Sequence, residues 1–121
     1  MSKRSIENYI PVVMEVLQKS FPKGEIPSSY NGYISAFGAS IMQSGLKPTL
    51  ALFENENNQD RTKEDKSFLP KIILEVLDGS HADDSLLRYV LSKPQREEIL
   101  RQQIIDIAIA VKLSIRTFKL V

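Results

Sequence analysis

Apolar residues recur every three or four positions through most of this 121-residue chain, with polar residues between them. This period matches the turn of an α-helix, so each such stretch predicts an amphipathic helix with one buried side. The stretches are residues 4–20, 30–53 with a break at Gly45, 67–78, a short one around 86–91, and 94 onwards. None of them favours a sheet. The pattern therefore predicts an all-α fold, a single-domain bundle of five to six helices over residues 1–121.

The stretch from Tyr30 to Phe53 is expected to organise the bundle. Ser28 and Ser29 offer side-chain oxygens to the unpaired N–H groups at the start of its first helix, and Gly45 is typical of a left-handed residue at a helix end. The apolar residues on one side of this helix are Tyr30, Tyr33, Ile34, Phe37, Ile41 and Met42. Both ends and the buried side are thus predicted.

Beyond the glycine, Pro48 suits the first turn of a short helix that returns to the core. The residues expected to bring it there are Leu50, Leu52 and Phe53. Other sides of the preceding helix carry the small residues Gly32, Ala36, Gly38 and Ala39. We therefore expect a helical hairpin with a tight glycine corner, which a second element can approach closely.

The last predicted helix is long and becomes more apolar towards its end. It begins near Pro94 and would extend over about 25 residues, or about 38 Å if unbroken. Residues 104–115 are apolar on nearly every side, with Asp106, Lys112 and Ser114 as exceptions. A helix that is apolar all round is buried. We expect this one at the centre of the bundle.

Residues 54–66 read ENENNQDRTKEDK and contain no apolar side chain. Nothing in this segment can offset the entropy lost on ordering it, so we predict a mobile polar loop at about 54–66. A solvated linker is one interpretation, and a partner-binding loop is the other.

Charge and composition narrow the class of protein. The 16 Lys and Arg nearly balance the 15 Asp and Glu, so any nucleic-acid site must be local. The chain has no cysteine, which excludes disulfides and thiolate metal sites. No apolar run is long enough to span a bilayer, and acidic residues interrupt the N-terminal segment. We expect a cytoplasmic protein with no membrane contact.

The glycine corner also carries a resemblance to a known family. The run Gln43-Ser44-Gly45-Leu46, then two residues, then Thr49-Leu50-Ala51 and Phe53, resembles a signature of the small subunit of Cmr-type (type III-B) CRISPR effector complexes. The small subunit of type III-A complexes, which is also helical, is the nearest alternative. The Gly-Leu-x-x-Thr-Leu-Ala spacing favours the Cmr type.

The resemblance implies a role in antiviral defence within an RNA-guided ribonucleoprotein. A subunit of this kind is expected to occur in several copies, to stack against itself and against the other Cmr subunits, and to contact crRNA and target RNA. RNA cleavage would belong to other subunits. The resemblance therefore implies a non-catalytic RNA-binding protein without a cofactor.

Basic residues are the candidate RNA contacts. Those of the last predicted helix are spaced to share one side of it: Arg101, Lys112, Arg116 and Lys119. Lys47 lies at the glycine corner, and Arg88, Lys93 and Arg96 cluster around the start of the last helix. Such residues need only meet phosphates, because guide pairing carries the sequence information. The alternative is that they solvate a helix surface and favour its dipole.

The tyrosines are a second candidate for RNA contact. Tyr9, Tyr30, Tyr33 and Tyr89 could stack on bases, although the helical spacing around Tyr30 and Tyr33 favours core packing.

Catalysis is poorly supported by the sequence. His81 is the sole histidine and falls in a predicted turn. The pairs Asp83-Asp84 and Glu97-Glu98 fall at helix starts, where carboxylates stabilise the N-terminal partial charge, so neither pair predicts a metal or acid–base site. No phosphate-cradling glycine loop or metalloprotease motif is present. We therefore expect no enzyme, no catalytic residue, no metal and no cofactor.

Two other classes of function remain open. A helical protein–protein adaptor or dimerising regulator without RNA binding would expose a continuous apolar patch and scatter its basic residues. An RNA-processing enzyme would need a cleft that joins His81 with carboxylates or lysines.

Overall fold

Helices make up nearly all of the regular structure in the computed structural model, which describes residues 3–54, 66–81 and 85–121. Six α-helices lie within these residues, together with three single-turn 3-10 helices and two short strands. The elements are α1 (Lys3–Ser20), β1 (Glu25–Ile26), α2 (Ser29–Ser44), α3 (Leu46–Phe53), α4 (Phe68–Leu77), η1 (Gly79–His81), α5 (Leu86–Leu91), η2 (Pro94–Arg96), α6 (Glu97–Ser114), η3 (Ile115–Thr117) and β2 (Lys119–Leu120). The predicted all-α bundle of five to six helices is confirmed.

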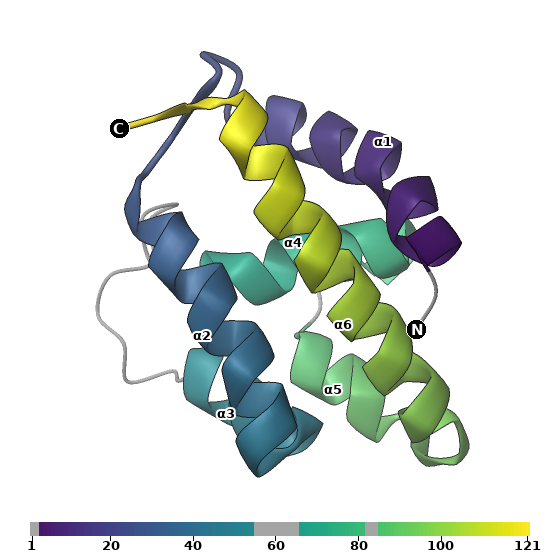
Figure 1. The fold of residues 1–121 in the computed structure, drawn as a ribbon. Helices are drawn as coiled ribbons and strands as arrows, with labels where there is room; N and C mark the ends of the chain where they lie inside the picture. The colour runs from purple at the N-terminus through teal and green to yellow at the C-terminus, as the bar shows by residue number, and fades with distance from the viewer. Residues whose placement is uncertain (1–2, 55–65, 82–84) are drawn as a thin grey trace.

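The C-terminal helix α6 is the element around which the others pack. It crosses the molecule in Figure 1 and contacts α1, α2, α4 and α5. Ile104, Ile107 and Val111 are fully buried along it, as expected for a helix that is apolar all round. Its regular part has 18 residues, about 27 Å, and is flanked by η2 and η3. The helical run from Pro94 to Thr117 is continuous through these two 3-10 turns, which confirms the predicted long C-terminal helix.

The hairpin of α2 and α3 forms as predicted around Gly45. This residue has φ 97° and ψ 168°, a conformation open almost only to glycine, and it differs from the left-handed helical geometry expected at the corner. The Gly45 N–H donates to Ile41 O at 3.0 Å, which closes the last turn of α2. Thr49 fixes the corner from the other side, because its Oγ1 donates to Gly45 O at 2.8 Å and lies 2.7 Å from Ser40 Oγ.

Several details of the hairpin differ from the prediction. Met42 and Leu52 are 70% and 53% exposed, so the buried sides of α2 and α3 are narrower than their apolar patterns. Ser28 makes no side-chain cap to α2. A Cβ added at Gly32 or Gly38 would meet nothing within 4 Å, so no described element approaches α2 closely at these two glycines.

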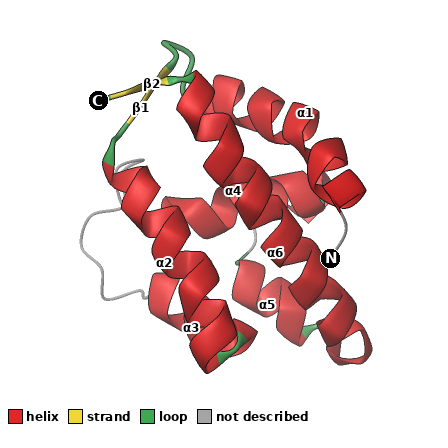
Figure 2. Ribbon diagram, in the orientation of Figure 1, coloured by secondary structure: helices red, strands yellow, loops and turns green. Residues whose placement is uncertain are grey.

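A short parallel strand pair ties the end of the chain to the segment between α1 and α2 (Figure 2). Glu25 pairs with Lys119 and Ile26 with Leu120. Ile26 is fully buried beneath this pair. Two residues per strand carry no readable alternation, so the sequence did not predict the pair.

The predicted mobile loop at about 54–66 lies mostly outside the described residues, which resume at Lys66. Glu54, at the edge of this segment, is described. Its carboxylate accepts hydrogen bonds from Ser85 Oγ at 2.8 Å and from the N–H groups of Leu86 and Leu87 at 2.9 and 3.0 Å. The Glu54 backbone thus ends α3, while its carboxylate caps the start of α5.

Candidate nucleic-acid interface

The turn from α5 into α6 brings two of the predicted basic residues together. The Lys93 N–H donates to Val90 O and the Arg96 N–H donates to Lys93 O, both at 3.0 Å. Pro94, whose ring fixes φ near the helical value, opens η2 between them. This local geometry places the Lys93 and Arg96 side chains on either side of one tight turn.

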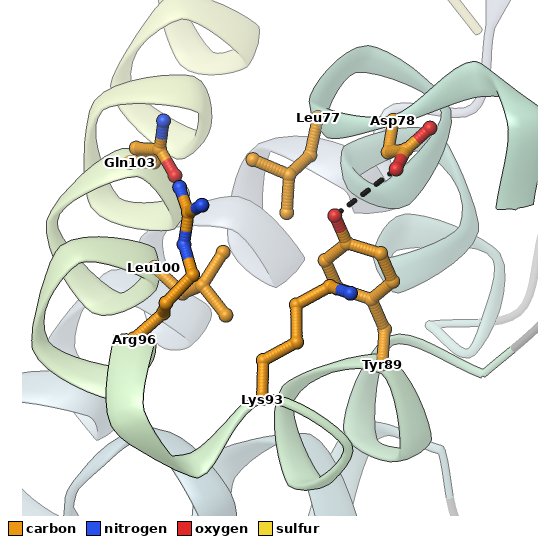
Figure 3. A pocket seen from close by; sticks show the side chains of 7 residues that line it. All are labelled: Leu77, Asp78, Tyr89, Lys93, Arg96, Leu100 and Gln103. Carbon is orange, nitrogen blue, oxygen red and sulfur yellow. Dashed lines mark hydrogen bonds between the residues drawn. The ribbon is translucent and has the colours of Figure 1, made fainter.

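Beside this turn lies a cleft of about 380 Å³ between the end of α4, α5 and the start of α6 (Figure 3). Its lining residues are Leu77, Asp78, Tyr89, Lys93, Arg96, Leu100 and Gln103. In Figure 3, Arg96 and Gln103 stand on one side, Tyr89 and Lys93 on the other, and Leu77 and Leu100 between them. The cleft thus combines two cations, one carboxylate and an aromatic ring, and its lining is mostly polar.

Tyr89 is held in the wall of the cleft by a hydrogen bond. Its hydroxyl donates to Asp78 Oδ2 at 3.1 Å, and Asp78 Oδ1 in turn accepts from the N–H and Oγ of Ser80 at 3.2 and 2.6 Å. Burial, together with the Asp78 carboxylate that accepts from the hydroxyl, raises the pKa of Tyr89 above its ordinary value of 10.0. The ring is therefore fixed in orientation and neutral at physiological pH.

Lys93 lies over the ring of Tyr89. Its Nζ is 4.9 Å from the ring centroid, within the range of a cation–π contact. Within the described residues, no carboxylate forms an ion pair with Lys93, Arg96 or Arg88. Among the described carboxylates, none therefore holds these three predicted RNA contacts at the α5–η2–α6 corner in an ion pair.

Three other predicted contacts are paired with carboxylates. Lys47 Nζ lies 2.9 Å from Glu97 Oε1, and Lys119 Nζ lies 4.0 Å from Glu25 Oε2. Arg101 Nη1 lies 3.6 Å from Glu98 Oε1, and its Nη2 lies 3.8 Å from the sulfur of Met42. A phosphate at these residues has a neighbouring carboxylate to displace, which makes them somewhat weaker candidates, although exposed ion pairs contribute only about 0–1 kcal/mol.

The predicted row Arg101, Lys112, Arg116 and Lys119 does not lie on one helix. The helix α6 ends at Ser114, so Arg116 falls in η3 and Lys119 in β2. That part of the prediction was wrong, because the chain turns through Ile115 towards the strand pair. Lys112 and Arg116 have no ion pair among the described residues.

Comparison with known proteins identifies the family. A family model described as CRISPR-associated protein (Cas_Cmr5) matches residues 2–110. The chain belongs to the Cas_Cmr5 family. This confirms the Cmr-type (type III-B) resemblance drawn from the glycine corner, and it implies assembly with other Cmr subunits. No curated protein and no solved structure gives a significant match to this chain.

Only some of the candidate acid–base and capping residues of this Cas_Cmr5 chain lie within the described residues. Glu97 and Glu98 lie in the first turn of α6, as predicted. Asp83, Asp84 and the His81 side chain lie outside the described residues, so the predicted capping by Asp83 and the role of His81 stay predictions. Among the described residues, no group of three potential ligands could hold a metal ion, and no helix has the length and apolar character needed to cross a membrane.

Sequence reasoning missed part of the cleft in this Cas_Cmr5 chain. Asp78 and Gln103 were not predicted to meet Tyr89 and Arg96, and no spacing in the sequence signals their meeting. The Asp78–Tyr89 hydrogen bond joins residues 11 positions apart in different helical segments. Only packing of α4, α5 and α6 brings them together.

Proposed function

We propose that this chain is a non-catalytic small subunit of a type III-B CRISPR ribonucleoprotein, present in several copies and in contact with crRNA and target RNA. Membership of the Cas_Cmr5 family is the observation that carries this proposal. The expected setting is antiviral defence in the cytoplasm, with the other Cmr subunits as protein partners.

The α5–η2–α6 corner is the surface that best suits the RNA contact. Arg88, Lys93 and Arg96 carry charge that no described carboxylate neutralises by an ion pair. Backbone phosphates are the ligand that such residues fit without reading bases. Lys112 and Arg116, which likewise have no ion pair with a described carboxylate, are a second candidate contact.

RNA binding through phosphate contacts is electrostatic and therefore depends on salt concentration. Neutralising phosphates releases counterions, so affinity falls as salt concentration rises. Guide pairing supplies the sequence information in RNA-guided complexes, which leaves the protein to follow the RNA backbone. Several copies in one assembly add their contacts, so weak binding by one copy suffices.

The experiment that tests this proposal is purification of the tagged protein from its own host, with mass spectrometry of the partners and sequencing of the RNA. We expect Cmr subunits and short repeat-tagged crRNAs. Recovery of an unrelated protein without RNA, while a control effector complex stays intact, would contradict the proposal and favour the adaptor alternative.

A further inference from the structure

We propose that the cleft between α4, α5 and α6 holds a single unstacked nucleotide of the bound RNA. This inference rests on the proposed function and deepens it, because it adds one seated base to the phosphate contacts. The cleft measures about 380 Å³, within the range of pockets that bind small ligands and sufficient for one nucleotide.

Tyr89 supplies the surface for the base. Its hydroxyl is fixed by the 3.1 Å hydrogen bond to Asp78, so the ring is oriented before RNA arrives. Leu77 and Leu100 line the space between the ring and the opposite wall (Figure 3). Stacking on an aromatic ring accepts any base, because every base has a π face.

Lys93 is placed to exchange the ring of Tyr89 for an RNA phosphate. In the free subunit its ammonium covers the ring of Tyr89 at 4.9 Å from the centroid. The lysine stem is flexible, so the ammonium can swing to a phosphate while a base takes its place on the ring. The cation–π contact would then keep the ring face covered until RNA replaces it.

The charges in the cleft set the direction of the nucleotide. Lys93 and Arg96 attract a phosphate, whereas the Asp78 carboxylate repels it and keeps it at their end. Gln103, beside Arg96, already forms a hydrogen bond with Tyr9, and the remaining capacity of its amide can meet a ribose or base edge. The phosphate therefore belongs at the η2 end and the base against Tyr89.

Photo-crosslinking in the assembled complex tests this placement. Target RNAs carrying iodouridine at successive single positions are bound, irradiated, and the crosslinked peptides are mapped by mass spectrometry. We expect crosslinks from a subset of positions on the peptide that contains Tyr89. Retained RNA whose crosslinks to this chain fall only on other peptides would overturn the cleft proposal and leave the proposed function standing. Retained RNA with no crosslink to this chain would also overturn the cleft proposal, whereas the proposed function, which rests on phosphate contacts, is tested by the co-purification.

A pair of variants separates stacking from structure. Tyr89→Phe removes the hydroxyl but keeps the ring, whereas Tyr89→Leu removes the aromatic face. We expect RNA affinity to fall about five- to a hundredfold for Tyr89→Leu, and to fall less for Tyr89→Phe, which loses the hydrogen bond to Asp78 but keeps the aromatic face. Equal affinity of the two variants would overturn the proposal. If Tyr89→Leu fails to fold, Lys93→Gln provides a second test, because it leaves the ring in place. We expect Lys93→Gln to weaken RNA binding, and unchanged binding would overturn the cleft proposal.

Discussion

The Leu86 N–H donates to Glu54 Oε2 at 2.9 Å, although these residues are 32 positions apart in the chain. The N–H groups at the start of a helix have no partner within the helix, and a carboxylate there also favours the helix dipole. The helix α5 has only six residues and would be unstable alone. Glu54, at the end of α3, therefore stabilises one wall of the candidate RNA site.

Removal of this cap should destabilise the protein. We expect Glu54→Ala to lower the free energy of unfolding by about 1–3 kcal/mol, because three hydrogen-bond donors are left without a charged acceptor. Urea denaturation measures the change. Glu7→Ala, at an exposed position of α1, is the control and should change stability by less than about 0.5 kcal/mol. Equal stability of the two variants would contradict the capping role.

The glycine corner predicts opposite effects for two similar substitutions. Gly45→Ala forces a side chain into the conformation at φ 97° and ψ 168°, so we expect a loss of about 1–3 kcal/mol. Gly38→Ala, within α2, has open space around the added Cβ and should stabilise the protein by about 0.5–1 kcal/mol. Thermal unfolding of both variants checks the prediction, and a shift of the same sign in both would refute it.

Tyr89 should make stability fall at alkaline pH. Its pKa is raised in the folded state by burial and by the bond to Asp78, so between the unfolded and folded values the folded protein holds a proton that the unfolded chain releases. Its contribution is present below the unfolded value of about 10 and is lost as pH rises through the folded pKa. We expect Tyr89→Phe to show a shallower decline in unfolding free energy above this pH. Identical slopes for the two proteins would contradict the assignment.

Lys112 and Arg116 should contribute to RNA binding without regard to sequence. We expect Lys112→Ala or Arg116→Ala to weaken binding by the assembled complex about equally for unrelated guide–target pairs. The slope of log affinity against log salt concentration should also become shallower by about 0.7 for each single-strand phosphate that the variant no longer neutralises. Filter binding over a range of salt concentrations provides both measurements. A weakening confined to one target sequence would indicate base reading.

Periodicity predicted most of the fold, because six helices with one apolar side leave few alternatives for a core. It could not predict how wide each buried side is, so Met42 and Leu52 were expected in the core and are exposed. The strand pair, in contrast, is too short to leave a pattern. Asp78 and Glu54 contribute through partners distant in sequence, which local spacing does not reveal.

The candidate site was only partly predictable for a related reason. Lys93 and Arg96 stand near each other in the chain, so their clustering could be predicted. Which basic residues lack a carboxylate partner depends on contacts between helices, such as Lys47 with Glu97. The ion pairs among the described residues therefore divide the predicted RNA contacts into paired and unpaired ones, a distinction that the sequence alone does not show.

The most direct test of the RNA role compares two triple variants in the purified complex. One carries Arg88→Gln, Lys93→Gln and Arg96→Gln, and the other carries Lys47→Gln, Arg101→Gln and Lys119→Gln, so net charge changes equally. We expect both to retain the Cmr partners, and the first to bind target RNA more weakly than the second, by about tenfold or more. Equal RNA affinity of the two complexes would contradict the assignment of the α5–η2–α6 corner as the RNA-binding surface.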